Sequence, residues 1–382
     1  MRFMVNLIAS SRVPLLLALG ASVVLASSLG CGDDEAVGTG GGSASSSAST
    51  GSPSSSSAVA GSSSSSQTTS SQTSSSTGEG GLGGGGGGAG GDGGSSSSTG
   101  DSLAVRAWFL GDTTREGVAS ATAWEDFAVN LDGLDTQGDL TGHCASPFGE
   151  SDDAPGGGDN SFGRNFVSFL SSIFKEPSTA ATQSHDDGQG TLAFQVFPID
   201  SRPDPLLGAL RPLQDRIEDT WQLDPIGLIG DDPDAPASRF DEVAITDDRF
   251  EATASGRIGL RIWMQGAPLV LEIEQAVVMI DLDSQQATGE GILAGVIDTE
   301  ALIEAFSPWL QEVTGGTDGL CLGDQLFEAV VQNIRGAQDM PLTGPQSENA
   351  ACDGISIGLG LDLHQVSVDG VGELRVPSSN CD

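Results

Sequence analysis

The sequence predicts an α+β fold, in which a mainly antiparallel sheet packs with a few amphipathic helices and follows a disordered tether. Many stretches in the second half of the chain alternate apolar with polar residues, which is the pattern of half-buried strands. Other stretches place apolar residues three and four positions apart, as amphipathic helices do. Residues 36–100 are nearly all Ser, Gly, Thr and Ala, and such a composition cannot bury a core.

The clearest strands lie between residues 256 and 297. Alternation in residues 258–264, 269–281 and 287–297 is interrupted only by short turns, the first of them at Gln265-Gly266. Consecutive strands joined by short turns predict an antiparallel meander with one face exposed to solvent.

The same alternation predicts further strands at residues 103–109, 127–131, 191–199, 355–363 and 371–376, and a hairpin joining 243–245 to 250–254. In the strand 355–363, Ser356, Gly358 and Gly360 stand opposite the apolar face. Their small size predicts that another element approaches this backbone closely.

Helical spacing predicts four helices, over residues 161–174, 205–218, 301–313 and 324–335. Asp159 or Ser161 is expected to cap the first helix, and Asp298 or Thr299 the third. Residues 175–177 are expected to end the first helix, and glycines follow the last two, where they serve as stop signals.

Residues 1–30 form a predicted lipoprotein signal peptide. Arg2 and Arg12 are the only charged residues before Cys31. The apolar run from Val13 to Leu25 is too short to span a bilayer as a stable helix.

The segment before Cys31 resembles the lipobox of bacterial lipoproteins, in which a cysteine thiol is diacylated and the signal is cleaved. Leu29 stands two residues before the cysteine, and Ser28 occupies the position where the motif has leucine. The resemblance implies that lipid on Cys31 anchors the exported protein to the outer membrane of the cell envelope, on its periplasmic or surface side. The alternative is an ordinary signal peptide with a free cysteine nearby.

A disordered tether is expected at residues 31–101, and a folded α+β domain at residues 102–382, as one unit or two subdomains. A flexible chain of about 64 residues spans about 45 Å root-mean-square, enough to lift a domain off a membrane. The glycine run is no phosphate loop, because no Lys-Ser/Thr pair follows it.

The chain is strongly acidic, with a formal net charge of −38 at pH 7. Nucleic acid and anionic lipid repel such a surface, so we expect no nucleic-acid partner and no charge-driven membrane binding. The charge suits a self-repelling surface protein, including one that meets divalent cations.

Four cysteines follow Cys31, namely Cys144, Cys321, Cys352 and Cys381. An even number in an exported chain predicts two disulfides, for which three connectivities exist. A hairpin across Asp369-Gly370 favours pairing Cys352 with Cys381. Free buried thiols are the alternative.

An acidic loop is the best candidate for chemistry. It offers hard oxygen ligands of the kind Ca²⁺ prefers, and its glycines would let it wrap an ion; these ligands are Glu150, Asp152, Asp153, Asp159 and Asn160. The order of an EF-hand is absent. The alternative is a solvated loop that caps the following helix.

Two other patterns carry little chemistry. Gly354-Ile-Ser356-Ile-Gly358 matches the G-x-S-x-G nucleophile motif, but the alternation continues through it, whereas the motif needs a sharp strand-to-helix turn. The three histidines, His143, His185 and His364, lack the spacing of a zinc helix.

The whole layout resembles myxobacterial-type surface lipoproteins with Ser/Gly-rich tethers. The resemblance rests on the lipobox, the tether, the segment Asp159–Asn165 and the strand Cys352–Gly358, and it implies no known activity. We therefore expect a lipid-anchored envelope protein whose domain binds a ligand or protein partner without catalysis. The alternatives are an exported hydrolase with non-local carboxylates and a Ca²⁺-stabilised surface module.

Overall fold

The computed structural model describes residues 102–137, 141–146, 153–195, 208–218, 220–283, 287–317 and 319–375. The predicted signal peptide, Cys31 and the tether lie outside these residues, and so do Glu150, Asp152 and Cys381. Within the described ranges, no helix combines the length and apolar character needed to cross a membrane.

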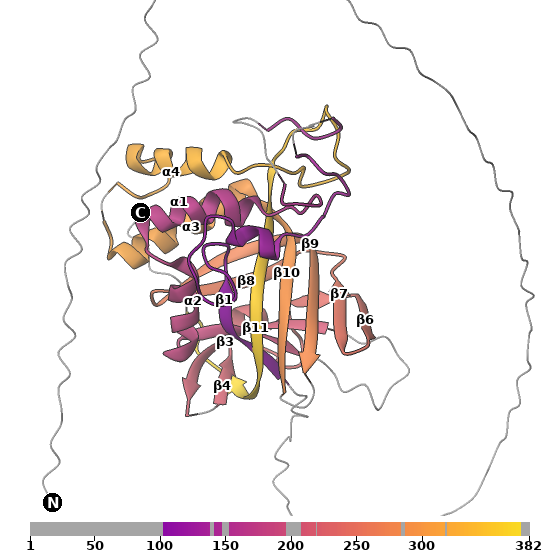
Figure 1. Cartoon of the computed structure of the whole chain (residues 1–382). Coiled ribbons are helices and arrows are strands. Elements are labelled where there is room, and N and C mark those ends of the chain that lie inside the picture. The colour runs from indigo at the N-terminus through magenta and orange to yellow at the C-terminus, as the bar shows by residue number, and fades with distance from the viewer. Residues whose placement is uncertain are drawn as a thin grey trace, which may run out of the picture. The chain divides into compact units, whose positions relative to one another are not determined.

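Eleven strands of the described chain form one sheet, which confirms the α+β prediction. The strand order is β1-β2-β3-β4-β11-β10-β9-β7-β6, with β5 on β3 and β8 on β9 (Figure 1). The strands are β1 (Ser102–Phe109), β2 (Gly190–Gln195), β3 (Gly208–Ile217), β4 (Thr220–Leu223), β5 (Ser238–Phe240), β6 (Glu242–Thr246), β7 (Arg249–Thr253), β8 (Ile258–Met264), β9 (Ala267–Asp283), β10 (Thr288–Asp298) and β11 (Gly354–Val371).

The last strand, β11, organises the sheet. It pairs antiparallel with both β10 and β1, and its final residues pair in parallel with β4. Since β1, β2, β3 and β4 also pair in turn, the pairings of these five strands form a closed circuit.

The predicted meander is confirmed as β8, β9 and β10. The long strand β9 serves two partners on one side, because β8 pairs with its first half and β7 with its second half. The hairpin β6–β7 is also confirmed, and Asp247 and Asp248 both adopt the positive φ that such a tight turn requires.

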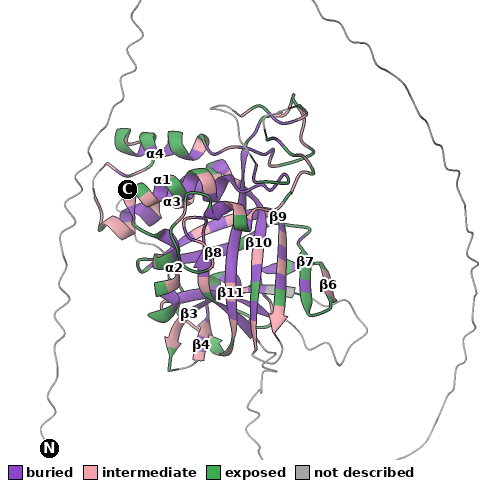
Figure 2. Ribbon diagram, in the orientation of Figure 1, coloured by how far each residue is buried: buried purple, intermediate pink, exposed green. Residues whose placement is uncertain are grey.

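The helices cover the sheet, and the main core lies between them (Figure 2). The described helical elements are η1 (Ala123–Phe127), a π-helix (Phe162–Val167) that continues into α1 (Ser168–Ile173), α2 (Pro177–Asp186), η4 (Pro225–Gly227), α3 (Thr299–Thr314) and α4 (Gln325–Arg335). Helix α3 packs along β9, and α2 packs on β1 and β8. Phe306 of α3 joins this helix to the π-helix, since its ring lies 5.3 Å from that of Phe166 and also 5.1 Å from that of Trp309 of α3.

Three of the four predicted helices are confirmed. Asp298 caps α3 by accepting hydrogen bonds from Glu300 N and Ala301 N, and Gly315 ends this helix at a φ of +72°. Helix α2 was not predicted, because Pro177 was interpreted as a stop signal, whereas it stands at the start of a new helix, where its missing N–H costs nothing.

Two predicted elements are wrong. The helix predicted over 205–218 is wrong where the structure describes it. Residues 208–217 form strand β3, because pairing with β2 and β4 outweighs the local spacing of the leucines. Residues 127–131 do not form a strand. Phe127 ends the short helix η1, its ring stacks on Phe109 at 5.6 Å, and η1 is the element that approaches Gly358 and Gly360.

The predicted final hairpin is also wrong, because β11 runs through Asp369-Gly370 to Val371 while pairing with β4. The predicted disulfide between Cys352 and Cys381, which rested on this hairpin, is wrong as well. Cys352 is bonded to Cys144, with 5.3 Å between their Cα atoms, and ties the loop before residue 146 to the start of β11. Cys321 is disulfide-bonded as well.

Candidate functional site

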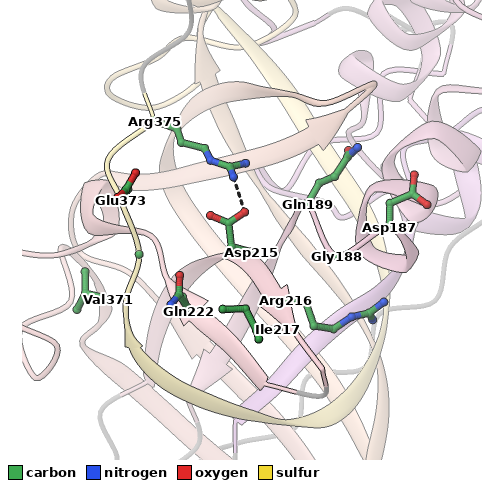
Figure 3. Close-up of a pocket in the computed structure, with 11 residues that line it drawn as sticks. Asp187, Gly188, Gln189, Asp215, Arg216, Ile217, Gln222, Val371, Glu373 and Arg375 are labelled. Atoms are coloured by element: carbon green, nitrogen blue, oxygen red, sulfur yellow. Dashed lines mark hydrogen bonds and ion pairs between the residues drawn. The ribbon is translucent and has the colours of Figure 1, made fainter. Parts of the chain in front are cut away.

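A polar cleft of about 680 Å³ lies beside the end of β11 (Figure 3). Four segments line it: the turn Asp187–Gln189 after α2, the residues Asp215–Ile217 of β3, Gln222 of β4, and residues 371–373 with Arg375. Because these segments are up to 188 positions apart in the chain (187 to 375), only the closed circuit of strands brings them together.

A bulge in β3 shapes one wall of the cleft. The pairing of β3 with β4 shifts register between Gln214 and Ile217, and Asp215 within the bulge has a φ of +50°. The turn after α2 holds this bulge, because Asp215 N donates to Gln189 O at 3.4 Å and Arg216 N donates to Gly188 O at 2.9 Å. Bulges and left-handed non-glycine residues are features that sheets often place at binding sites.

The segment after β11 forms the opposite wall. Gly372 N donates to Leu223 O at 2.8 Å, and Gln214 Nε2 donates to Glu373 O at 2.7 Å. A Cβ at Gly372 would lie 2.3 Å from Gln214 Nε2, so a larger residue there would displace this amide. These two contacts hold the backbone of the wall in place, and Glu373 and Arg375 line the cleft.

An ion pair between Arg375 and Asp215 crosses the cleft (Figure 3). The Arg375 side chain is 46% exposed and that of Asp215 29%, so water screens the pair and its net contribution to stability is small. A charged group of a ligand can therefore replace either partner of this ion pair at little cost in free energy.

A buried ion pair contacts the backbone of the cleft wall at Arg375. Arg261 and Asp224 are both fully buried and bonded to each other, and Arg261 Nη2 also donates to Arg375 O at 3.3 Å. Two cations lie over the Trp263 ring, with the guanidinium carbon of Arg375 at 5.8 Å and that of Arg261 at 6.0 Å from its centroid. A rigid base of this kind holds the Arg375 backbone in place while its side chain stays accessible.

The cleft combines charges of both signs with two amides. Its charged and amide side chains are Asp187, Asp215, Glu373, Arg216, Arg375, Gln189 and Gln222. Such a lining can hydrogen-bond a polar ligand and pair with an ionic group of either sign. Sequence reasoning missed this site because only Asp187-Gly188 carries a local signal, that of a turn.

The described residues of the predicted calcium loop bind the chain's own backbone. Asp153 Oδ2 accepts from Thr136 N at 2.7 Å, and Asp159 Oδ2 accepts from Leu131 N at 2.7 Å. Burial raises the pKa of Asp159 to about 8. Calcium binding at this loop stays a prediction, which a change of melting temperature on adding Ca²⁺ or a chelator would test.

Asn160 lies at the centre of a buried network. Its Nδ2 donates to Trp124 O and Gly358 O, both at 3.0 Å, and its Oδ1 accepts from Gly163 N at 3.0 Å and Gly358 N at 2.9 Å. Sequence analysis placed Asn160 among metal ligands, but all these contacts join separate pieces of backbone.

Ser356 belongs to the same network and lies inside β11, as predicted. Its hydroxyl donates to Asp339 and accepts from Ser161 N at 2.8 Å, so it is not free to attack a substrate. Burial raises the pKa of Asp339 to about 7. Neither Asp339 nor Asp159 lines the cleft.

His143, Cys144 and Cys352 form the one group of possible metal ligands in the described ranges, with ligand atoms within 4.8 Å of one another. The two cysteines are joined in a disulfide, so only the imidazole is available as a metal ligand. His143 is itself hydrogen-bonded to Gln346 at 3.2 Å.

No protein-family model, curated protein or solved structure matches this chain.

Proposed function

We propose that this chain is an exported, lipid-anchored envelope protein whose folded domain binds a polar ligand in the cleft without catalysis. The observation that carries the proposal is the cleft itself, where a bulged strand and a separate backbone segment hold the exposed charges of Asp215 and Arg375 face to face. The lipobox resemblance at Cys31 supports the anchor, and the Cys144–Cys352 disulfide is compatible with export.

Native mass spectrometry of the full chain, purified from membranes in mild detergent, tests the binding function. We expect a bound polar species on the wild-type protein and at least about tenfold lower occupancy on Arg375→Ala, because the variant loses the accessible cation. Arg249→Ala is the matched control, since Arg249 is 44% exposed, is paired with Glu251 and Asp281, and lies on β7 outside the cleft. A bound species that persists on Arg375→Ala would place the binding site elsewhere.

Fractionation of cells tests the anchor separately. Cys31→Ser should move the protein from the membrane fraction to the soluble fraction, because no acyl chains can be attached. Unchanged fractionation would contradict lipidation at Cys31.

A second candidate is an exported hydrolase, which the three carboxylates of the cleft favour, namely those of Asp187, Asp215 and Glu373. Incubating the co-purified species with the wild-type protein and with Asp187→Asn distinguishes the two functions. Fragments that carry the mass of added water, formed only by the wild-type protein, would establish hydrolysis.

A further inference from the structure

Two histidines meet next to elements that line the cleft. His185 of α2 and His364 of β11 pack edge to face, with 5.0 Å between their ring centroids. The His185 ring also packs on Trp221 of β4 at 5.5 Å. The fold thus brings together two imidazoles that are 179 positions apart in the chain (185 to 364), although the sequence shows them only as scattered residues.

Each ring has a buried nitrogen with no hydrogen-bond partner among the described residues, namely Nε2 of His185 and Nδ1 of His364. The other nitrogen of His185, Nδ1, lies 3.1 Å from the Asp186 carboxylate, which can only accept, so Nδ1 carries the proton and Nε2 holds a lone pair. His185 is 3% exposed. In its neutral form, His185 therefore holds a buried proton acceptor at Nε2.

The charges that face the pair are mostly positive. Arg106 of β1 and Arg216 of β3 act on both rings, while Asp186 of α2 is the one acidic group that acts on His185. Burial is the largest cause that lowers the pKa of both histidines. At His185 the hydrogen bond and charge of Asp186 oppose it and the two guanidinium groups add to it, whereas at His364 the neighbouring His185 and the guanidinium groups add to it. Trp221 is not free to stabilise a protonated histidine by a cation–π interaction, because the Arg216 guanidinium already lies over its ring at 5.4 Å.

The same residues build the wall of the cleft. Asp187 and Gly188 follow His185 directly at the end of α2, and Arg216 both flanks the pair and lines the cleft. The hydrogen bonds from Asp215 N and Arg216 N to the turn after α2 are what hold this wall in place. Displacement of the end of α2 would break them.

We propose that the His185–His364 pair is a proton sensor that opens the cleft in mildly acidic surroundings. A proton on His185 adds a cation inside a buried site, close to Arg216, which is half-buried, and to Arg106, which is exposed. Moving the end of α2 outward gives that cation access to water, and it releases the turn Asp187–Gln189 from the β3 bulge. The role in ligand release rests on the proposed function, whereas the opening itself does not.

Hydrogen–deuterium exchange of the ligand-free full chain tests the sensor, from about pH 7.5 to about pH 5, after correction for the intrinsic pH dependence of exchange. We expect protection of the peptides that cover residues 184–190 and 213–217 to fall at least about tenfold across this range. Peptides from β9 and β10 should keep their protection.

His185→Phe keeps a ring against Trp221 but cannot be protonated, and His364→Gln removes the second imidazole. In each single variant the acid-induced loss of protection should shrink, and in the double variant it should vanish. His143→Gln, which changes the third histidine, outside the pair, should behave as the wild type. An unchanged pH response in the double variant, or no response in the wild type, would overturn the proposal. Because no ligand is present, neither result depends on whether the cleft binds one.

Discussion

Two polar regions of this domain differ in how they use their side chains. In the network around Asn160, which comprises Asp159, Asn160, Ser161, Asp339 and Ser356, the side chains are buried and bonded to backbone or to one another. In the cleft, the ion pair of Asp215 and Arg375 remains accessible to solvent.

The difference teaches that the density of acidic residues in the sequence is a poor guide to function here. The loop before Asn160 is the most conspicuous acidic stretch of the folded region, yet its described side chains join segments of backbone. The cleft draws single residues from four segments, none of which is conspicuous by itself. We expect the network to govern stability and the cleft to govern binding.

The largest expected effect is that of raising the pH from acidic to neutral on the stability of the network. Asp159 and Asp339 keep their protons in the folded chain up to about pH 8 and about pH 7, whereas an unfolded chain releases them near pH 4. Their stabilising effect is therefore complete below about pH 4 and is lost as pH rises through the folded values, by on the order of 1 kcal/mol per pH unit and group. Urea unfolding at pH 5 and pH 7 should show this loss in the wild type.

Asp339→Asn tests the contribution of Asp339, because its amide cannot ionise while the histidines remain as in the wild type. The difference in stability between wild type and variant should shift in favour of the variant as pH rises. A pH-independent difference would show that Asp339 is ionised in the fold.

The disulfide is expected to contribute about 4 kcal/mol, because it closes a loop across a sequence separation of 208. Replacing both Cys144 and Cys352 by Ser should lower the free energy of unfolding in urea by about this amount. Ligand occupancy of the cleft should not change. If occupancy falls together with stability, the two regions are coupled and the comparison fails.

Asn160→Ala should cost about 3 kcal/mol, because it leaves buried donors and acceptors of Trp124, Gly163 and Gly358 without partners. Asn333→Ala is the matched control. Asn333 is exposed and donates only to Ala329 O of its own helix, so we expect a change within about 0.5 kcal/mol in urea unfolding. Equal effects of the two variants would contradict a central role for Asn160.

The smallest effect on stability is expected at the cleft. Asp215 and Asp247 both have a φ of +50°, so Asp215→Gly and Asp247→Gly should each change the free energy of unfolding by less than about 1 kcal/mol. Only Asp215→Gly should lower the occupancy of the cleft in native mass spectrometry, because Asp247 belongs to the β6–β7 turn. Equal ligand occupancy in both variants would show that Asp215 in the β3 bulge does not contribute to binding.

Sequence patterns predicted the elements that local periodicity determines. The meander β8–β10, the hairpin β6–β7 and helices α3 and α4 all carry their signals within one segment, including Asp298 as a cap and Gly315 as a stop. The prediction failed for β3, where Leu210 and Leu213 are spaced as in a helix but are buried by pairing between β2 and β4.

The candidate site was not predictable for the same physical reason. The position of Arg375 opposite Asp215 depends on the parallel pairing of β11 with β4, which no short-range pattern encodes. The small residues Gly358 and Gly360 did carry information, since they predicted the close approach that Phe127 makes.

The position of β11 has a consequence for the order in which the domain can fold. Strands β1, β4 and β10 all pair with β11, so a growing chain that still lacks residues 354–371 lacks one of the two partners of each of these strands. Contacts of such long range form late and slowly. We therefore expect the circuit of strands to close only after residues 354–371 have been synthesised.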